Sequence, residues 1–277
     1  MRRTGKALTV VGVVFAWSAV AAPVATPPDF VPIQEKAQGR SLVGSNILND
    51  SLYSNPAGSV FTQAYAVEAS MQMGGTFAAS IVDTKTSAVG GSIGVFRTPV
   101  GGGIDDYSQG IRLGVMHRLS DALGVGVTGK MLWGPRQADG QRTSRFDGDL
   151  GFLANFERVQ FGGMFRNVLG GDGRLAQDRE VGLGGRINYD NTVFFSAATY
   201  MRTSDWNPYQ IGFGAEYISP YYFSVKGGYY FRPRENFSAW SAGASILSPK
   251  FSLHYAVEFP NVVGRSPEHS LAIAVLL

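Results

Sequence analysis

The three histidines of the chain and the serine Ser270 are its first candidates for acid–base, metal or nucleophilic chemistry. His117, His254 and His269 share no spacing typical of metal ligands, and the sequence has no cysteine, so we expect neither a metal site nor a disulfide framework. Ser270 follows His269, which raises the possibility of a hydrolase. A membrane phospholipase needs Ser, His and an acid or carboxamide to converge on its lipid face, whereas Ser270 is expected to point to the opposite face. We therefore expect no catalytic residue, no cofactor and no enzymatic activity.

A second candidate is a glycine-rich stretch with a lysine. Gly124-Val125-Gly126-Val127-Thr128-Gly129-Lys130 matches a phosphate-binding loop up to its lysine, but Met131 stands where that loop needs a hydroxyl for Mg²⁺. The stretch also alternates with period two, which places Lys130 on the same face as the glycines and the threonine. We interpret it as a strand with an inward-facing lysine.

Most other chemistry-bearing side chains fall on one face of alternating segments. Their signs are mixed and glycines lie between them, whereas a porin selective for one ion sign would show an excess of the opposite charge. Such a face suits an interior in which charges pair with each other, with lumen water or with a packed polar segment. The predicted inward-facing charges are Glu68, Arg112, Lys130, Asp147, Asp149, Arg166, Arg186, Glu216, Lys226, His254 and Glu258.

The alternation itself runs from residue 64 to the last residue. Leu271, Ile273 and Val275 are one apolar row, and Ile211, Phe213 and the alternate positions after them form another. A period of two predicts strands with one apolar and one polar or small face. This is the pattern of a transmembrane β-barrel with lipid outside and a polar lumen inside. A secreted β-sandwich is the alternative, but it does not need apolar alternation on every strand.

We therefore expect an all-β fold, a transmembrane antiparallel β-barrel over residues 64–277. Short and long connections alternate, which predicts short turns and both barrel ends on the periplasmic side and longer loops outside. Aromatic residues near strand ends, Tyr200 and Tyr230 among them, are interpreted as two interfacial girdles. The fourteen expected strands are residues 64–73, 76–84, 88–97, 108–118, 122–133, 146–155, 158–167, 179–189, 192–202, 208–218, 221–231, 237–247, 250–259 and 268–277.

Residues 1–21 have the organisation of a secretory signal peptide. A basic head with Arg2, Arg3 and Lys6 precedes an apolar stretch too short to span a bilayer, and Ala19-Val20-Ala21 is a cleavage site. The full chain has 24 basic and 21 acidic residues, and cleavage would remove three of the basic ones and no acid. The balanced remainder has no basic excess to neutralise phosphates, so we expect no nucleic-acid partner.

Residues 22–63 lack the alternation, and we expect them to form an N-terminal plug or hatch segment. They contain Asn55-Pro56-Ala57-Gly58, and here the chain resembles the FadL-like outer-membrane barrels, the superfamily of long-chain fatty acid transporters and their PorV-like relatives. Residues 163–171, 212–217 and 268–273 also match the style of the smaller relatives. The resemblance implies fourteen strands, an N-terminal segment that enters the lumen, and a place in the outer membrane of a Gram-negative bacterium.

Two functions remain open from the sequence. The first is a passive channel for small or hydrophobic molecules, gated by residues 22–63. The second, implied by PorV-like relatives, is a scaffold that anchors a secretion, motility or surface-assembly complex. A transporter needs an apolar pocket near the outer mouth or a side opening, and a scaffold needs an exposed apolar patch outside the membrane band. The expected partners are outer-membrane lipid, with either a hydrophobic small-molecule ligand or other envelope proteins.

Overall fold

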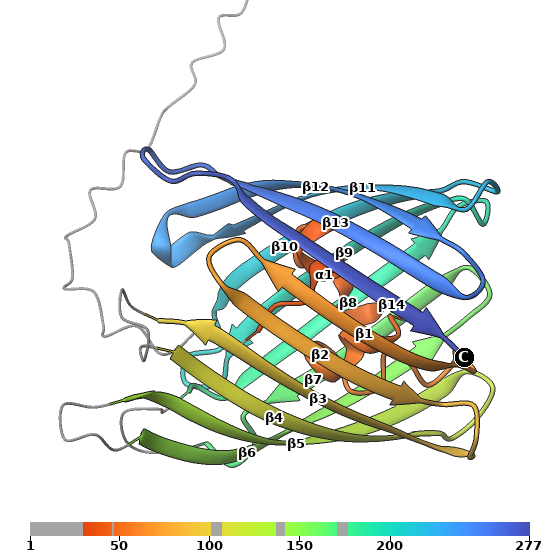
Figure 1. Ribbon diagram of the computed structural model, residues 1–277, viewed down its shortest axis with the longest axis horizontal. Helices are drawn as coiled ribbons and strands as arrows, with labels where there is room; N and C mark the ends of the chain where they lie inside the picture. The colour runs from red at the N-terminus through yellow and green to blue at the C-terminus, as the bar shows by residue number, and fades with distance from the viewer. Residues whose placement is uncertain (1–29, 46, 101–106, 137–141, 171–176) are drawn as a thin grey trace, which may run out of the picture.

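The computed structural model describes residues 30–45, 47–100, 107–136, 142–170 and 177–277. Fourteen strands among these residues close into one antiparallel barrel, in which β1 completes the ring by pairing with β14 (Figure 1). The predicted fold, an antiparallel barrel of fourteen strands, is confirmed. No helix in the described part of the chain is long and apolar enough to cross a membrane.

Most strands lie within a few residues of their predicted bounds. The largest difference is the β5–β6 hairpin, which extends to Arg136 and resumes at Arg142. The register shifts between Trp133 and Arg136, and such a bulge accommodates the intervening glycine and proline within a strand. The strands are β1 Tyr65–Gln72, β2 Thr76–Asp83, β3 Val89–Pro99, β4 Tyr107–Arg118, β5 Leu123–Arg136, β6 Arg142–Asn155, β7 Val159–Arg166, β8 Glu180–Asn188, β9 Val193–Arg202, β10 Pro208–Ile218, β11 Phe223–Arg232, β12 Phe237–Leu247, β13 Phe251–Pro260 and β14 Glu268–Leu276.

The barrel has two different rims. At the turn rim, short connections join the strands and the two ends of the barrel chain meet, where Leu277 N donates to Tyr65 O at 2.8 Å. At the loop rim, the connections are generally longer and include the 3₁₀ turn η3, Pro233–Glu235. Figure 1 shows the C-terminus at the turn rim, on the right, and the β13–β14 connection at the opposite end.

The alternating rows face as the sequence predicts. Leu271, Ile273 and Val275 are exposed on the outer face of β14, whereas Ser270, the residue before Leu271 on the same strand, faces inward and is buried. His269 and Ser270 therefore point to opposite faces of the strand and do not converge. The girdle interpretation is wrong for Tyr200 and Tyr230, which are buried against the lumen rather than exposed to lipid.

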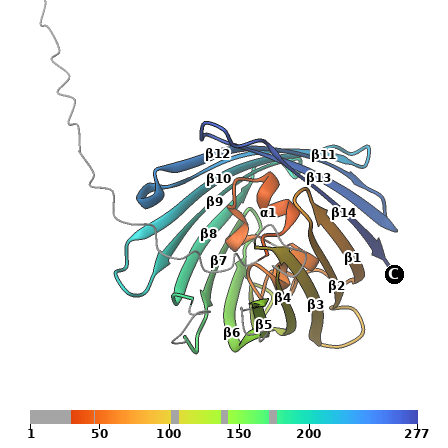
Figure 2. The same cartoon turned by 60° about the vertical axis from the view of Figure 1, so that its left-hand side comes forward.

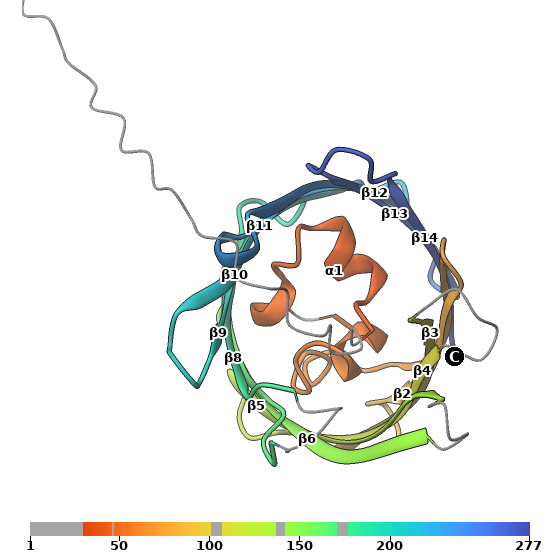
Figure 3. The ribbon, with the colours of Figure 1, turned by 90° about the vertical axis from the view of Figure 1, so that its left-hand side faces the viewer.

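The N-terminal part of the described chain lies inside the barrel. Residues 30–63, here called the lumenal segment, run from the loop rim to the turn rim within the ring of strands (Figures 2 and 3). They form the helix α1, Ile33–Ala37, and the 3₁₀ turns η1, Leu42–Gly44, and η2, Asn49–Leu52. The predicted signal peptide, residues 1–21, and residues 22–29 of the predicted plug lie outside the described residues.

Glycines on the inner wall allow the lumenal segment to lie directly against the strands. A Cβ atom added to Gly228 would come within 2.2 Å of Gly39 N, and one added to Gly44 would come within 2.3 Å of Gly184 O. Gly39 itself has a φ of +61°, a conformation that L side chains rarely adopt. The glycine-rich face predicted from the sequence is therefore a contact surface for another stretch of backbone.

The outward direction of Phe213 leads to a first prediction. Phe213 is 50% exposed on the outer face of β10, so we expect Phe213→Arg to destabilise the barrel in lipid by roughly 2–4 kcal/mol. Phe213→Leu, which keeps an apolar side chain there, should cost much less. Denaturant unfolding in lipid vesicles measures both variants, and equal stabilities would contradict the facing.

The two adjacent glycines of β11 give a second prediction, with an internal control. Gly228→Ala should displace the lumenal segment and cost about 1–3 kcal/mol, because its new methyl group overlaps the backbone of Gly39. Gly227→Ala should be tolerated, because the nearest atom to its added Cβ is Ser241 O at 3.9 Å. Thermal unfolding and protease resistance of the two proteins distinguish these outcomes, and equal behaviour would show that Gly39 does not pack there.

Candidate functional site

The motif Asn55-Pro56-Ala57-Gly58 ties the lumenal segment to itself and to the wall. Asn55 is fully buried. Its Nδ2 donates to Val43 O at 2.7 Å and to Phe152 O, on β6, at 2.9 Å, while its Oδ1 accepts from Ala57 N at 3.0 Å. The amide therefore joins two turns of the segment to one strand.

A first network of predicted charges lies on strands β4 to β6. Lys130 Nζ donates to Asp149 Oδ1 at 2.7 Å, and Arg112 Nη1 donates to Asp149 Oδ2 at 3.1 Å. Arg112 Nη1 also lies 3.3 Å from Leu52 O, to which it donates, so this network reaches the lumenal segment. Arg112, Lys130 and Asp149 are each no more than 1% exposed, so their charges depend on these partners, and the equally buried Asp147 pairs with Arg145.

Asp147 and Asp149 also complete the barrel wall. The regular ladder between β6 and β7 covers only Leu150 to Asn155 of β6, which leaves the half of β6 nearer the loop rim without it. There Asp149 Oδ1 accepts from Asn167 N at 2.9 Å, and Asp147 Oδ1 accepts from Leu169 N at 3.1 Å. Side-chain oxygens thus satisfy backbone donors that a continued ladder would have paired.

A second network lies on strands β8 to β13. Arg186 Nη2 donates to Glu216 Oε2 at 2.8 Å, and Lys226 Nζ lies 3.4 Å from Glu216 Oε1. Lys226 Nζ also donates to Ser245 Oγ at 2.9 Å, and the same hydroxyl shares a hydrogen bond with His254 Nδ1 at 2.8 Å. His254 is therefore part of a polar chain across three strands.

The lumenal segment contacts this second network through two glutamines. Gln38 Nε2 donates to Glu216 at 3.5 Å, and Lys226 Nζ donates to Gln34 Oε1 at 3.3 Å. Elsewhere Arg166 Nη2 donates to Tyr53 O at 3.1 Å. The predicted charges thus separate into several clusters rather than forming a single site, and most clusters include an atom of the lumenal segment.

Glu258 on β13 fixes the beginning of the lumenal segment. Its Oε2 lies 3.3 Å from Lys36 Nζ, and its Oε1 accepts from Arg40 Nε at 3.3 Å. Glu258 is only 2% exposed. Removing one partner of a buried ion pair typically costs about 3–5 kcal/mol, because the remaining charge is left uncompensated.

Glu68 on β1 contacts an acidic side chain instead. Its carboxyl hydrogen-bonds the carboxyl of Asp50, in η2, and both groups are buried. Asp50 Oδ2 also accepts from Gln34 N at 3.1 Å. Burial, together with the charge of nearby Glu35, raises the pKa of Asp50 to about 7. A proton between the two carboxyl groups is therefore part of this contact.

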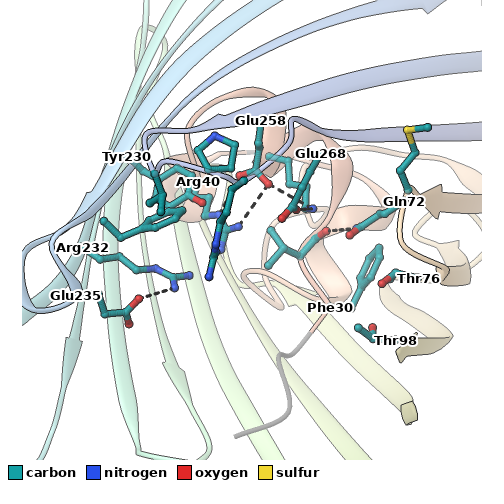
Figure 4. A pocket seen from close by; sticks show the side chains of 17 residues that line it. Phe30, Arg40, Gln72, Thr76, Thr98, Tyr230, Arg232, Glu235, Glu258 and Glu268 are labelled. Carbon is teal, nitrogen blue, oxygen red and sulfur yellow. Dashed lines mark hydrogen bonds and ion pairs between the residues drawn. The ribbon is translucent and has the colours of Figure 1, made fainter. Parts of the chain in front are cut away.

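A cavity at the loop rim is the part of the site that the sequence did not predict. It has a volume of about 690 Å³ and lies between the lumenal segment and the ends of β1, β11, β12, β13 and β14 (Figure 4). Of the predicted site residues, only Glu258 lines it. The run Tyr230-Phe231-Arg232-Pro233-Arg234-Glu235, with its aromatics and arginines before a long loop, was the available sequence signal.

The loop-rim pocket mixes aromatic rings with charges. The Arg40 guanidinium lies 4.5 Å from the ring centroid of Tyr230, and Arg232 Nη1 donates to Glu235 Oε2 at 3.1 Å. At the other end, Gln72 Nε2 donates to the carbonyl oxygen of Val31 at 2.9 Å. Figure 4 shows these side chains around the pocket, with Phe30 of the lumenal segment beside Thr76 and Thr98.

No protein-family model and no curated protein matches the chain. Solved structures match most of its length. The toluene transporter TbuX of Ralstonia pickettii is 13% identical, with a TM-score of 0.62 over 90% of this chain and 97% of that chain. The toluene transporter TodX of Pseudomonas putida is 11% identical, with a TM-score of 0.66 over 87% and 96%. A FadL homologue of Pseudomonas aeruginosa is 12% identical, with a TM-score of 0.56 over 88% and 97%.

The chain therefore has the fold of the FadL-like outer-membrane transport barrels. The resemblance inferred from its sequence motifs is confirmed at the level of the fold. At these identities the match extends to the barrel architecture, and the solute is a separate question.

The Asp50 contact predicts that docking of the lumenal segment depends on pH. A carboxyl whose pKa is raised from 3.8 to about 7 stabilises the docked state fully below about pH 4, and this contribution falls progressively until the pH reaches about 7. We expect amide hydrogen exchange in residues 30–63 to accelerate between about pH 4 and 7 and to change little above that range, after correction for the intrinsic exchange rate.

Asp50→Asn is the matched control for this prediction. The asparagine amide can donate to Glu68 without a proton that titrates, so the variant should lose the step in exchange rate between about pH 4 and 7. An unchanged step in the variant would assign the pH dependence to other groups.

Proposed function

We propose that this barrel is a passive channel for small or hydrophobic molecules across the outer membrane of a Gram-negative bacterium, and that the lumenal segment closes it. The observation that carries the proposal is the position of the loop-rim pocket. Its inner boundary includes Phe30, Lys36 and Arg40 of the lumenal segment. A solute that enters from the loop rim therefore meets the segment before it can reach the turn rim.

The structurally similar barrels support this choice of function. They include proteins described as toluene transporters and as a monoaromatic hydrocarbon channel. The barrel fold and its apolar outer face support an outer-membrane location with lipid as a partner. The signal peptide expected at residues 1–21 would deliver the chain to the envelope.

The packing of the lumenal segment is compatible with movement. Its apolar contacts are divided among small clusters, such as Ile33 and Ala37 against Ala256 and Ala272, rather than joined into one continuous core. Its remaining attachments are hydrogen bonds and ion pairs, which lumen water can replace when the segment shifts. Local opening of this kind is typical of elements with few buried apolar contacts.

The scaffold alternative needs an apolar surface beyond the membrane band. Tyr189, Tyr221 and Tyr222 are exposed at the turn rim. Aromatics at that depth serve equally as the interfacial girdle of a membrane barrel, so they do not favour a protein partner. Transport is therefore the function we carry forward.

A reversible lock tests whether the segment must move. The chain has no cysteine, and Ser41 Oγ in the segment lies 2.6 Å from Ser196 Oγ on β9. In the double variant Ser41→Cys, Ser196→Cys, oxidation should abolish solute flux into liposomes and reduction should restore it. The two single variants, treated identically, should conduct under both conditions.

Deletion of residues 31–52 is the complementary experiment. If the segment closes the channel, the shortened barrel should show clearly higher conductance in planar bilayers than the intact protein. Equal flux through the oxidised and reduced lock, together with equal conductance of the deletion variant, would rule out closure by this segment.

A further inference from the structure

The loop-rim pocket gathers guanidinium groups around two aromatic rings. The guanidinium carbons of Arg40 and Arg232 lie 4.5 and 5.9 Å from the ring centroid of Tyr230. Those of Arg232 and Arg265 each lie 5.7 Å from the ring centroid of Phe237. Three cationic side chains therefore border the same part of the pocket. They come from the lumenal segment, from the end of β11 and from the connection between β13 and β14.

Part of the donor capacity of these arginines is not used by the described residues. Arg40 directs Nε and Nη2 to Glu258, and Arg232 directs Nε to Gln210 and Nη1 to Glu235. Nη1 of Arg40 and Nη2 of Arg232 make no hydrogen bond within the described parts of the chain. Arg265 is exposed, and the contact described for its side chain is with the Phe237 ring. The planar guanidinium group of arginine presents its N–H donors as a fork, which binds carboxylates well.

The carboxylates of the pocket do not cancel this excess. Glu258 pairs with Lys36 and Arg40, and Glu235 pairs with Arg232. Lys36 also lies 3.3 Å from Glu268. The pocket thus holds four cationic side chains against three carboxylates, so a further anion improves its charge balance. The cations are Lys36, Arg40, Arg232 and Arg265, and the carboxylates are Glu235, Glu258 and Glu268.

The dimensions of the pocket limit the body of the ligand. A volume of about 690 Å³ suits a compact organic molecule. Phe30, Tyr230 and Phe237 supply apolar and aromatic walls. Below the pocket, most of the described residues of the lumenal segment are buried, so among the described residues the pocket does not continue as a long slot for an alkyl chain.

We propose that the loop-rim pocket binds small organic carboxylates, such as aromatic acids. The carboxylate accepts hydrogen bonds from Arg40 and Arg232, and the apolar body lies against the aromatic walls. This assignment names the solute class of the channel proposed above. The claim that these carboxylates are transported rests on the proposed channel function, whereas the claim that they bind in the pocket does not. A pocket that recognises a carboxylate in this way differs from a pocket suited to an uncharged hydrocarbon.

Binding to the full-length protein in nanodiscs, measured by calorimetry, tests the proposal. Benzoate should bind saturably, and benzamide, its neutral isostere, should bind at least about tenfold more weakly, because it lacks the charge-assisted hydrogen bonds. Arg232→Gln should weaken benzoate binding by a similar factor. Arg234→Gln is the matched control, because Arg234 lies on the same turn and pairs with Asp205 instead of lining the pocket.

Each of the other experimental results would contradict one named part of the proposal. Equal binding of benzoate and benzamide, or an unchanged affinity in Arg232→Gln, removes the anion site. Palmitate that binds as tightly as benzoate to the same pocket removes the restriction to small ligands. Benzoate that binds but never crosses liposomes leaves the site intact and removes the channel function. Flux across liposomes without any preference for benzoate over benzamide leaves the channel function intact and removes the anion site.

Discussion

Charge pairing inside the barrel is the constraint on which the rest of the structure depends. A strand that faces lipid on one side turns its polar residues into the lumen, where a buried charge without a partner is costly. The wall pairs some charges by itself, as Lys130 does with Asp149 at 2.7 Å. Others need the lumenal segment, as Glu258 needs Lys36 and Arg40. The segment is therefore part of the electrostatic balance of the wall as well as a filling of the lumen.

Close approach of backbone to backbone is the second requirement, and it explains where the glycines lie. Ion pairs at about 3 Å form only if the segment can settle against the strands. Gly228 and Gly212 permit this, because a methyl group at either position would overlap the backbone of Gly39 in the segment. Small residues on the inner face and paired charges around them thus serve the same contact. A barrel with an open aqueous lumen would have no such need for glycine on its walls.

The sequence predicted the strands well, because a strand has only two faces and lipid requires one of them to be apolar throughout. The girdle prediction failed because it considered the position of each aromatic residue along its strand but not the face to which its side chain points. Tyr200 and Tyr230 lie near strand ends but on the inward face, where Tyr200 donates to Glu35 and Tyr230 lies under Arg40. The loop-rim pocket was missed for another reason. Its walls come from strands far apart in sequence that meet only when the barrel closes.

The two kinds of charge network respond differently to withdrawal of the lumenal segment. Arg112 donates to both Leu52 O and Asp149, so the segment and the β6–β7 wall share one guanidinium. Asp149 keeps Lys130 when the segment leaves, and the wall there remains paired. Glu258 is different, because both of its cationic partners in the described residues belong to the segment. Movement of the segment would therefore change the charge balance most at the loop rim, beside the loop-rim pocket.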